Sequence, residues 1–214
     1  MDIKLRGIHV HLPGNPNPLF RLPEWNIPFG SRILIHGPSG SGKTTLLHLL
    51  SGQLLPEEGE IEVGQYCFTK MSEDSRCYLR RKHFGIIFQS LNLFPHFNVD
   101  ENMELGQLKS TKDCEGKNKL ALSRVGLKSG SLQRCGTMSL GEQQRGAVAR
   151  VLAFSPDIIL ADEPTSSLDH INAERVITAL LDSSNRGTVV VVSHDERIKL
   201  AFKSVLSFTD LVHA

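Results

Sequence analysis

The sequence has no long hydrophobic run and no export signal. Its strongly apolar stretches, such as 158–161 and 189–192, are four residues long, whereas a membrane-spanning helix needs about twenty. The first residues, MDIKLRGIHVHLPG, lack the charged start and apolar stretch of a signal peptide. We therefore expect a cytoplasmic chain that would serve a membrane only from outside the bilayer.

Excess charge and paired cysteines are also missing. The 24 basic and 23 acidic side chains leave a formal charge of +1, which gives no electrostatic reason to expect a nucleic-acid partner. The four cysteines lack the close paired spacing of zinc or redox sites and favour a reduced compartment: Cys67, Cys77, Cys114 and Cys135. With 214 residues, 40% apolar and 22% charged, the chain is expected to form one globular unit of ordinary composition.

The first third of the chain predicts strands followed by a glycine loop and a helix. Residues 3–10 alternate loosely, 13–18 form a proline and glycine loop, and 32–36 are a short apolar strand. After the glycine loop, the leucines of 43–50 have helical spacing. Gly52 stands where a helix C-terminus favours glycine.

The middle of the chain changes character. Between residues 91 and 152, strand formers are few and helix-like stretches appear at 117–125 and 142–153. The last third returns to alternating strands and helices, at 158–161, 172–181 and 188–192.

These patterns predict an α/β fold, and the segment 37–44 (GPSGSGKT) makes its core one of the P-loop NTPase type. We expect a mainly parallel sheet with an antiparallel β part near the N-terminus. A single domain, 1–214, would consist of a nucleotide-binding core, 1–90 and 153–214, and an embedded helical lobe, 91–152.

A phosphate-binding loop lies between the third predicted strand and the first helix. Residues 37–44 match G-x-x-x-x-G-K-[ST]. Glycines allow the backbone to direct its amides at phosphate oxygens, Lys43 supplies a cation, Thr44 a hydroxyl for Mg²⁺, and the helix N-terminus favours the anion. The predicted nucleotide-binding residues of this segment are Gly37, Pro38, Ser39, Gly40, Ser41, Gly42, Lys43, Thr44 and Thr45.

Two carboxylates and a histidine follow later strands. Asp162 and Glu163 end an apolar strand, and His194 comes shortly after another. Parallel sheets present ligand sites at the carboxyl ends of their strands, so these side chains should meet the phosphate loop. Asp162 would hold Mg²⁺ and Glu163 would position or deprotonate the attacking water. Taken alone, such a pair is more typical of a solvated turn, and a lone histidine of a structural or surface position. Together with the phosphate loop, the functional interpretation is favoured.

The remaining motifs resemble those of ABC ATPases, in family order and over essentially the whole chain. Residues 84–89 (FGIIFQ) resemble the glutamine loop, 138–150 (MSLGEQQRGAVAR) the signature motif and its helix, 162–169 (DEPTSSLD) the second acidic motif and D-loop, and 189–198 (VVVVSHDERI) the switch-histidine region. The segments GPSGSGKTTLLHLLSG and FQSLNLFP most resemble those of the small ATPase subunits for lipoprotein release, macrolide efflux and the related cell-division system.

The resemblance implies a head-to-tail dimer that encloses two ATP molecules. Ser139 and Gly141 would contact the γ-phosphate bound to the other copy, and Asp169 would cross the interface. Gln89 would contact Mg²⁺ and relay the nucleotide state to an integral membrane permease, and His194 would sense the γ-phosphate. The chain would then be an ATPase held peripherally on the inner face of the cell membrane.

Two positions depart from the family pattern. The signature reads Met138–Ser139–Leu140–Gly141–Glu142, with leucine at the usual first glycine. Leu140 loses backbone freedom and adds bulk beside the dimer interface, which predicts a weakened signature. Ser139 and Glu142 also form an S-x-x-E capping box, which predicts a helix start with a free hydroxyl. The aromatic residue that usually stacks on adenine is missing near the end of the first strand, where residues 9–12 read HVHL; His11 is either its substitute or a partly exposed strand-end histidine.

Three other functions compete with transport. An ABC ATPase that handles DNA or ribosomes would carry tandem cassettes or coiled-coil insertions, which are missing. A P-loop kinase of small molecules would lack the signature segment. A nucleotide-gated regulator of a membrane protein stays open as an alternative.

Overall fold

The computed structural model describes residues 1–11, 18–105, 112–182 and 187–213, with the backbone only at 112–114. The strands are β1 Ile3–His11, β2 Pro18–Ile27, β3 Arg32–His36, β4 Glu58–Val63, β5 Tyr66–Cys67, β6 Phe84–Ile87, β7 Ile158–Asp162, β8 Thr188–Ser193 and β9 Ser204–Ser207. The α-helices are α1 Lys43–Leu50, α2 Glu73–His83, α3 Val99–Leu105, α4 Lys112–Arg124, α5 Leu140–Phe154, α6 His170–Leu181 and α7 Phe208–His213. The described residues also include the 3₁₀ helices η1 Phe68–Lys70, η2 Cys135–Thr137 and η3 Glu196–Ala201.

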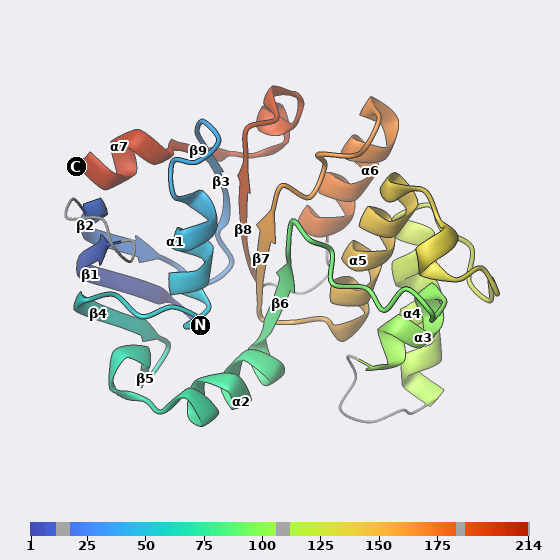
Figure 1. Cartoon of the computed structure of the whole chain (residues 1–214), viewed down its shortest axis with the longest axis horizontal. Coiled ribbons are helices and arrows are strands. Elements are labelled where there is room, and N and C mark those ends of the chain that lie inside the picture. Colours follow the sequence, from blue (N-terminus) through green and yellow to red (C-terminus); the bar gives the residue numbers. More distant parts are fainter. Residues whose placement is uncertain (12–17, 106–111, 183–186, 214) are drawn as a thin grey trace.

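The strands form two sheets. One is antiparallel, with strand order β2-β1-β4-β5, and the other is parallel, with order β6-β7-β8-β3-β9. In Figure 1 the antiparallel sheet and α1 lie on one side of the parallel strands, and α3 to α6 lie on the other. The predicted combination of a parallel core and an antiparallel N-terminal part is confirmed.

The parallel sheet is buried on both faces. In β8, Val189 and Val191 join a core formed with α3 to α6, whereas Val190 and Val192 join a core formed with α1 and the antiparallel sheet. All four are at most 1% exposed. A strand covered on both faces must be apolar at every position, which explains the run of valines.

Several predicted elements have the bounds expected from the sequence. β3 and α1 occupy 32–36 and 43–50. Gly52, after the C-cap residue Ser51, has φ 65°, the left-handed conformation expected of a helix-ending glycine. Residues 13–17 of the predicted proline and glycine loop lie outside the described residues. The helix α2 was not predicted, although Ser72 caps it through a bond from Ser75 N–H.

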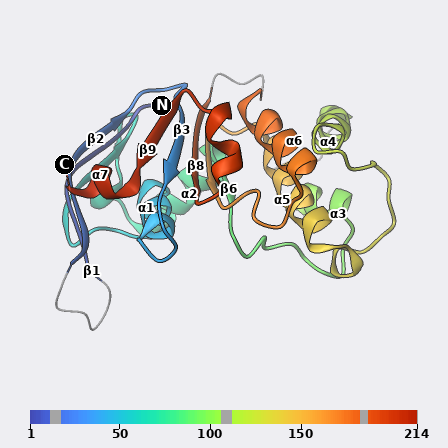
Figure 2. The same ribbon diagram turned by 90° about the horizontal axis from the view of Figure 1, so that it is seen from above.

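The helices within 91–152 pack against one another beside the parallel sheet. Helix α5 contacts α3, α4 and α6, and its C-terminal half reaches β6. Figure 2 shows α3, α4, α5 and α6 grouped at one end of the molecule. Among the described residues, none of the helices combines the length and the apolar character needed to cross a bilayer.

Candidate nucleotide-hydrolysis site

The predicted site residues follow four adjacent strands. In the order β6-β7-β8-β3, these strands run parallel, so their carboxyl ends share one edge of the sheet. Gln89 follows β6, Asp162 and Glu163 end β7, His194 follows β8, and the phosphate loop follows β3. The expectation that distant segments meet at this edge is therefore met by the topology.

The phosphate loop is shaped by glycines. Gly40 and Gly42 have φ 76° and 107°, in the region that only glycine enters without strain. A Cβ on Gly42 would also lie 3.1 Å from the ring of Phe20, which packs edge-on against Phe208. Both backbone conformation and space thus require glycine where α1 begins.

Lys43 lies inside this loop. Its Nζ donates to the carbonyls of Gly37, at 2.8 Å, and Pro38, at 2.7 Å. The residue is 6% exposed, and burial lowers the pKa of its ammonium, whereas the charges of Glu163 and Asp162 raise it. Ser41 Oγ is buried in the same loop and has no hydrogen-bond partner among the described residues. The loop thus offers a positioned cation and a hydroxyl available to a ligand.

Thr44 joins the phosphate loop to β7. Its Oγ1 donates to Asp162 Oδ2 at 2.7 Å. Burial raises the pKa of Asp162, and the hydrogen bond from Thr44 opposes that rise. A hydroxyl and a carboxylate are thereby held in contact beside Lys43.

The carboxylate of Glu163 is held by three groups from the end of β8. Its Oε2 accepts from Ser193 Oγ at 2.6 Å, and its Oε1 accepts from the His194 backbone N–H at 3.0 Å. His194 Nδ1 lies 2.7 Å from the same Oε1. With Nδ1 in contact with Glu163, Nε2 is the ring nitrogen left for another partner.

The backbone of Glu163 is unusual as well. It has φ 47°, and the residue is 6% exposed. A left-handed conformation costs a residue other than glycine roughly 1 kcal/mol or more, and such strain concentrates at functional sites. The geometry therefore singles out Glu163 together with His194.

The signature segment begins α5 through the predicted capping box. Ser139 Oγ accepts from Glu142 N–H, and Glu142 Oε2 accepts from Ser139 N–H at 2.9 Å. The expectation of a free hydroxyl is wrong, because Ser139 Oγ also donates to Glu142 Oε2 at 2.7 Å. These bonds lower the pKa of Glu142.

Leu140 and Gly141 form the first turn of α5. Leu140 is 58% exposed and is not among the described residues with positive φ. The argument that this position needs glycine's backbone freedom is therefore wrong, and only the bulk of the leucine matters. Gly141 does need to be small, because a Cβ there would lie 3.1 Å from the carbonyl oxygen of Ser167.

Asp169, Gln89 and His11 are found in three different settings. Asp169 caps α6 by accepting from Asn172 N–H at 2.8 Å, which lowers its pKa. Gln89 is exposed in the turn after β6. His11 Nδ1 lies 2.7 Å from Glu57 Oε2 in an ion pair, and the residues that follow it, 12–17, are not described.

The sequence did not predict the polar contacts that Gln144 and Asp195 make with the segment after β7. Gln144 of α5 is 2% exposed and bonds the backbone of Glu163 and Ser167. Asp195 accepts from Thr165 Oγ1 at 2.8 Å. Both partners lie about 20 to 30 residues away along the chain, so no local pattern pointed to them.

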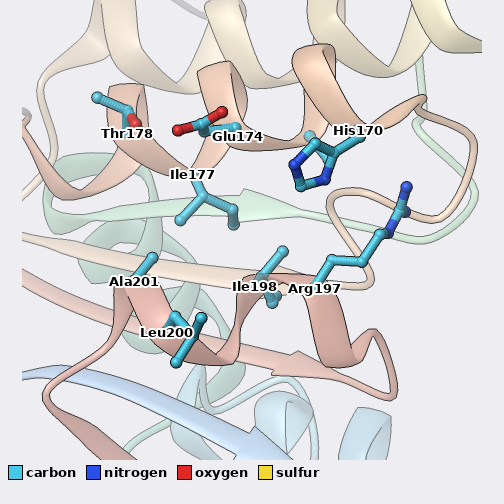
Figure 3. Close-up of a pocket in the computed structure, with 9 residues that line it drawn as sticks. His170, Glu174, Ile177, Thr178, Arg197, Ile198, Leu200 and Ala201 are labelled. Atoms are coloured by element: carbon cyan, nitrogen blue, oxygen red, sulfur yellow. The ribbon is translucent and has the colours of Figure 1, made fainter.

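A separate pocket of about 330 Å³ lies between α6 and η3. Figure 3 shows Glu174 and Thr178 on one side of it and Arg197 and Leu200 on the other. Its lining contains none of the predicted site residues.

Loop, acidic strand end and histidine together define a P-loop nucleotide hydrolase. The comparisons narrow this class: the family model described as ABC transporter matches residues 21–166. The chain therefore belongs to the ABC transporter family, as an ATP-binding domain and ABC-type ATPase.

Relatives and solved structures agree with this membership. The lipoprotein-releasing system ATP-binding protein LolD of Legionella pneumophila (strain Paris) is 41% identical over 182 residues, which cover 83% of this chain and 80% of that protein. The macrolide export ATP-binding/permease protein MacB of Photorhabdus laumondii is 32% identical over 97% of this chain but only 33% of its own length. The dimeric structure of MJ0796, a bacterial ABC transporter cassette, has a TM-score of 0.85 and 30% identity, and covers 95% of this chain and 92% of that one.

Proposed function

We propose that this ATPase binds Mg²⁺-ATP between two head-to-tail copies of itself and drives a separate membrane permease of the lipoprotein-release or export type. Its similarity to LolD over most of both chains supports the assignment to a permease encoded apart, and the dimeric cassette supports the pairing. In this proposal residues 91–152 are the helical subdomain that presents the signature.

The observation that carries the proposal is the contact chain Thr44–Asp162–Glu163–His194 along adjacent strand ends. Thr44 donates to Asp162, and Glu163 accepts from His194. Lys43 stands within the electrostatic reach of both carboxylates. A polyphosphate at this edge would meet a cation, two carboxylates and an imidazole in fixed positions, which is the arrangement that phosphoryl transfer requires.

The residues present fit Mg²⁺. Thr44 and Asp162 offer hard oxygen atoms that already touch at 2.7 Å, and Gln89 follows the neighbouring strand. No cluster of three or more His, Cys, Asp or Glu suited to a metal occurs among the described residues. Mg²⁺ in nucleotide sites takes only one or two protein ligands and completes its shell with phosphate and water. When bound, it would neutralise charge on the β- and γ-phosphates.

Glu163 and His194 divide the remaining chemistry. Glu163 would orient and deprotonate the attacking water, since it is the carboxylate at the strand end that does not bond Thr44. Its contact with Nδ1 holds the imidazole so that Nε2 would face the γ-phosphate. Among the described residues, Glu163 Oε2 accepts only from Ser193 Oγ, so an acceptor site is left for the attacking water.

The permease would dock beside the turn that carries Gln89. Phe94 and Phe97 are 56% and 39% exposed, with ring centroids 5.9 Å apart. Asn102 fixes this loop, since its Oδ1 accepts from Phe94 N–H at 2.7 Å. Exposed aromatic side chains on a fixed loop are typical of interface anchors.

The substitution Glu163→Gln tests the proposal. It keeps the size of the side chain and removes the base, so the ATP hydrolysis rate should fall by about 100-fold or more. ATP should stay bound, and the protein should elute as a dimer in ATP during size-exclusion chromatography. Glu60→Gln, whose side chain on β4 is 43% exposed and pairs with Lys70, is the matched control and should hydrolyse ATP as the wild type does. Hydrolysis by Glu163→Gln at the wild-type rate would refute the assignment of the base.

A further inference from the structure

Gln144 is a buried amide that bonds two backbone groups of the segment 163–168. Its Nε2 donates to the carbonyl of Glu163 at 2.8 Å, and its Oε1 accepts from Ser167 N–H at 2.9 Å. The two backbone partners fix the orientation of the amide, because a carbonyl can only accept and a peptide N–H can only donate. A side chain that is 2% exposed and satisfied at both ends is held in one position.

The Glu163 carbonyl belongs to the strained residue of the site. With φ 47°, Glu163 needs surrounding contacts to hold its backbone in place. Its N–H donates to the carbonyl of Val192 at 3.0 Å, and its carbonyl accepts from Gln144. The parallel sheet therefore holds the backbone N–H of Glu163, and α5 holds its carbonyl.

The same helix carries the signature. Gly141, one turn before Gln144, lies so close to Ser167 that a Cβ would come within 3.1 Å of its carbonyl oxygen. Gln144 also lies near Ser166, with Nε2 3.4 Å from the hydroxyl. The first turns of α5 and the segment 163–168 thus form one packed unit.

We infer that Gln144 is a positioning residue for hydrolysis: it transmits the position of the signature helix to the backbone of Glu163. The inference rests on the proposed role of Glu163 as base. A shift of α5 on nucleotide binding would move the Glu163 carbonyl through the Gln144 side chain, whose amide is bonded at both ends. Gln144 itself does not touch nucleotide; its effect is on the orientation of the Glu163 carboxylate.

The substitution Gln144→Leu tests the inference in the purified full chain. Removing both bonds should lower kcat for ATP about tenfold or more, because small misplacements of a catalytic group are costly. The Kd for ATP should change less than about threefold, since the phosphate loop is untouched. Gln144→Glu keeps the acceptor for Ser167 N–H and loses the donor to Glu163, so it should show the same loss of kcat, and it serves if Gln144→Leu does not fold.

Two control experiments distinguish a positioning role of Gln144 from a general loss of stability. Val148→Ala removes buried apolar volume from the same helix and should lower Tm while kcat stays within about twofold of the wild type. In a Glu163→Gln background, Gln144→Leu should produce no further loss of residual hydrolysis, because the group that it positions is already gone.

The outcomes distinguish the inference from the proposed function. An inactive Glu163→Gln together with a Gln144→Leu and a Gln144→Glu of wild-type kcat would overturn the inference alone. The inference would also be overturned if Gln144→Leu lowered the residual hydrolysis of Glu163→Gln by the same factor as it lowers kcat in the wild-type background. An equally large loss of kcat in Val148→Ala would overturn it as well. A fully active Glu163→Gln would overturn both.

Discussion

Replacing Asp195 with asparagine should lower the free energy of unfolding, and the size of this loss should depend on pH. Asp195 accepts from Arg197 Nε at 2.9 Å and Nη2 at 2.8 Å, and from Thr165 Oγ1 at 2.8 Å. The bonds from Arg197 are the main cause that lowers the pKa of Asp195 from 3.8 to about 2, against the opposing effect of burial, and Thr165 adds to the lowering. Asp195 thus ties η3 to the segment that follows Glu163.

The size of the effect follows from that pKa. A fall from 3.8 to about 2 corresponds to about 2.4 kcal/mol at 1.36 kcal/mol per pH unit. Because the Arg197 side chain is 40% exposed, solvent screening reduces the expected contribution to about 1 to 2 kcal/mol. The pKa is lower in the folded state, so this stability is present above pH 3.8 and is lost as the pH falls toward 2.

Urea denaturation of the wild type and Asp195→Asn measures the difference. At pH 7 the variant should have a free energy of unfolding lower by about 1 to 2 kcal/mol, and the gap should narrow as the pH falls below 3.8. Arg197→Gln, which removes the main cause of the lowered pKa, should lose a comparable amount with the same pH dependence. Equal stability of wild type and Asp195→Asn at pH 7, or a gap that is constant down to pH 3, would contradict the reasoning.

Two further substitutions address the nucleotide site. Lys43→Met keeps most of the side chain's volume but removes the phosphate-binding cation, so ATPase activity should fall by about 100-fold or more; a steady-state phosphate-release assay checks this, and activity near that of the wild type would argue against the role of Lys43. Leu140→Gly removes an exposed side chain beside the proposed dimer interface, so ATP-dependent dimerisation of the Glu163→Gln variant should tighten severalfold; analytical ultracentrifugation that finds an unchanged dimer Kd would show that leucine is harmless there.

The parts of the fold and site with local signals were predictable from the sequence. Glycine spacing and a leucine pattern gave the phosphate loop and α1, and the S-x-x-E pattern gave the capping box at Ser139. The helix α2 had signals that went unused: a serine cap, Glu73 and Asp74 in its first turn and four basic residues in its last. The residues of α2 thus carry the local pattern of a helix.

Other features depend on contacts that no local pattern records. The hydrogen bond from Gln144 to the Glu163 carbonyl joins residues 19 apart in sequence, and the hydrogen bond from Thr165 to Asp195 joins residues 30 apart. Only sheet order and helix packing decide which polar side chains meet at such distances. The left-handed backbone at Glu163 is equally hidden, because nothing in a glutamate predicts a positive φ.

The two hydrophobic cores on opposite faces of the parallel sheet have a consequence for how the protein tolerates change. Alternate residues of one strand, such as Val190 and Val191, belong to different cores, so a cavity made under α1 does not open into the layer under α5. Substitutions on the two faces should therefore add independently in their effect on stability. The layer beneath α5 can thus be repacked while the layer that supports the phosphate loop keeps its packing.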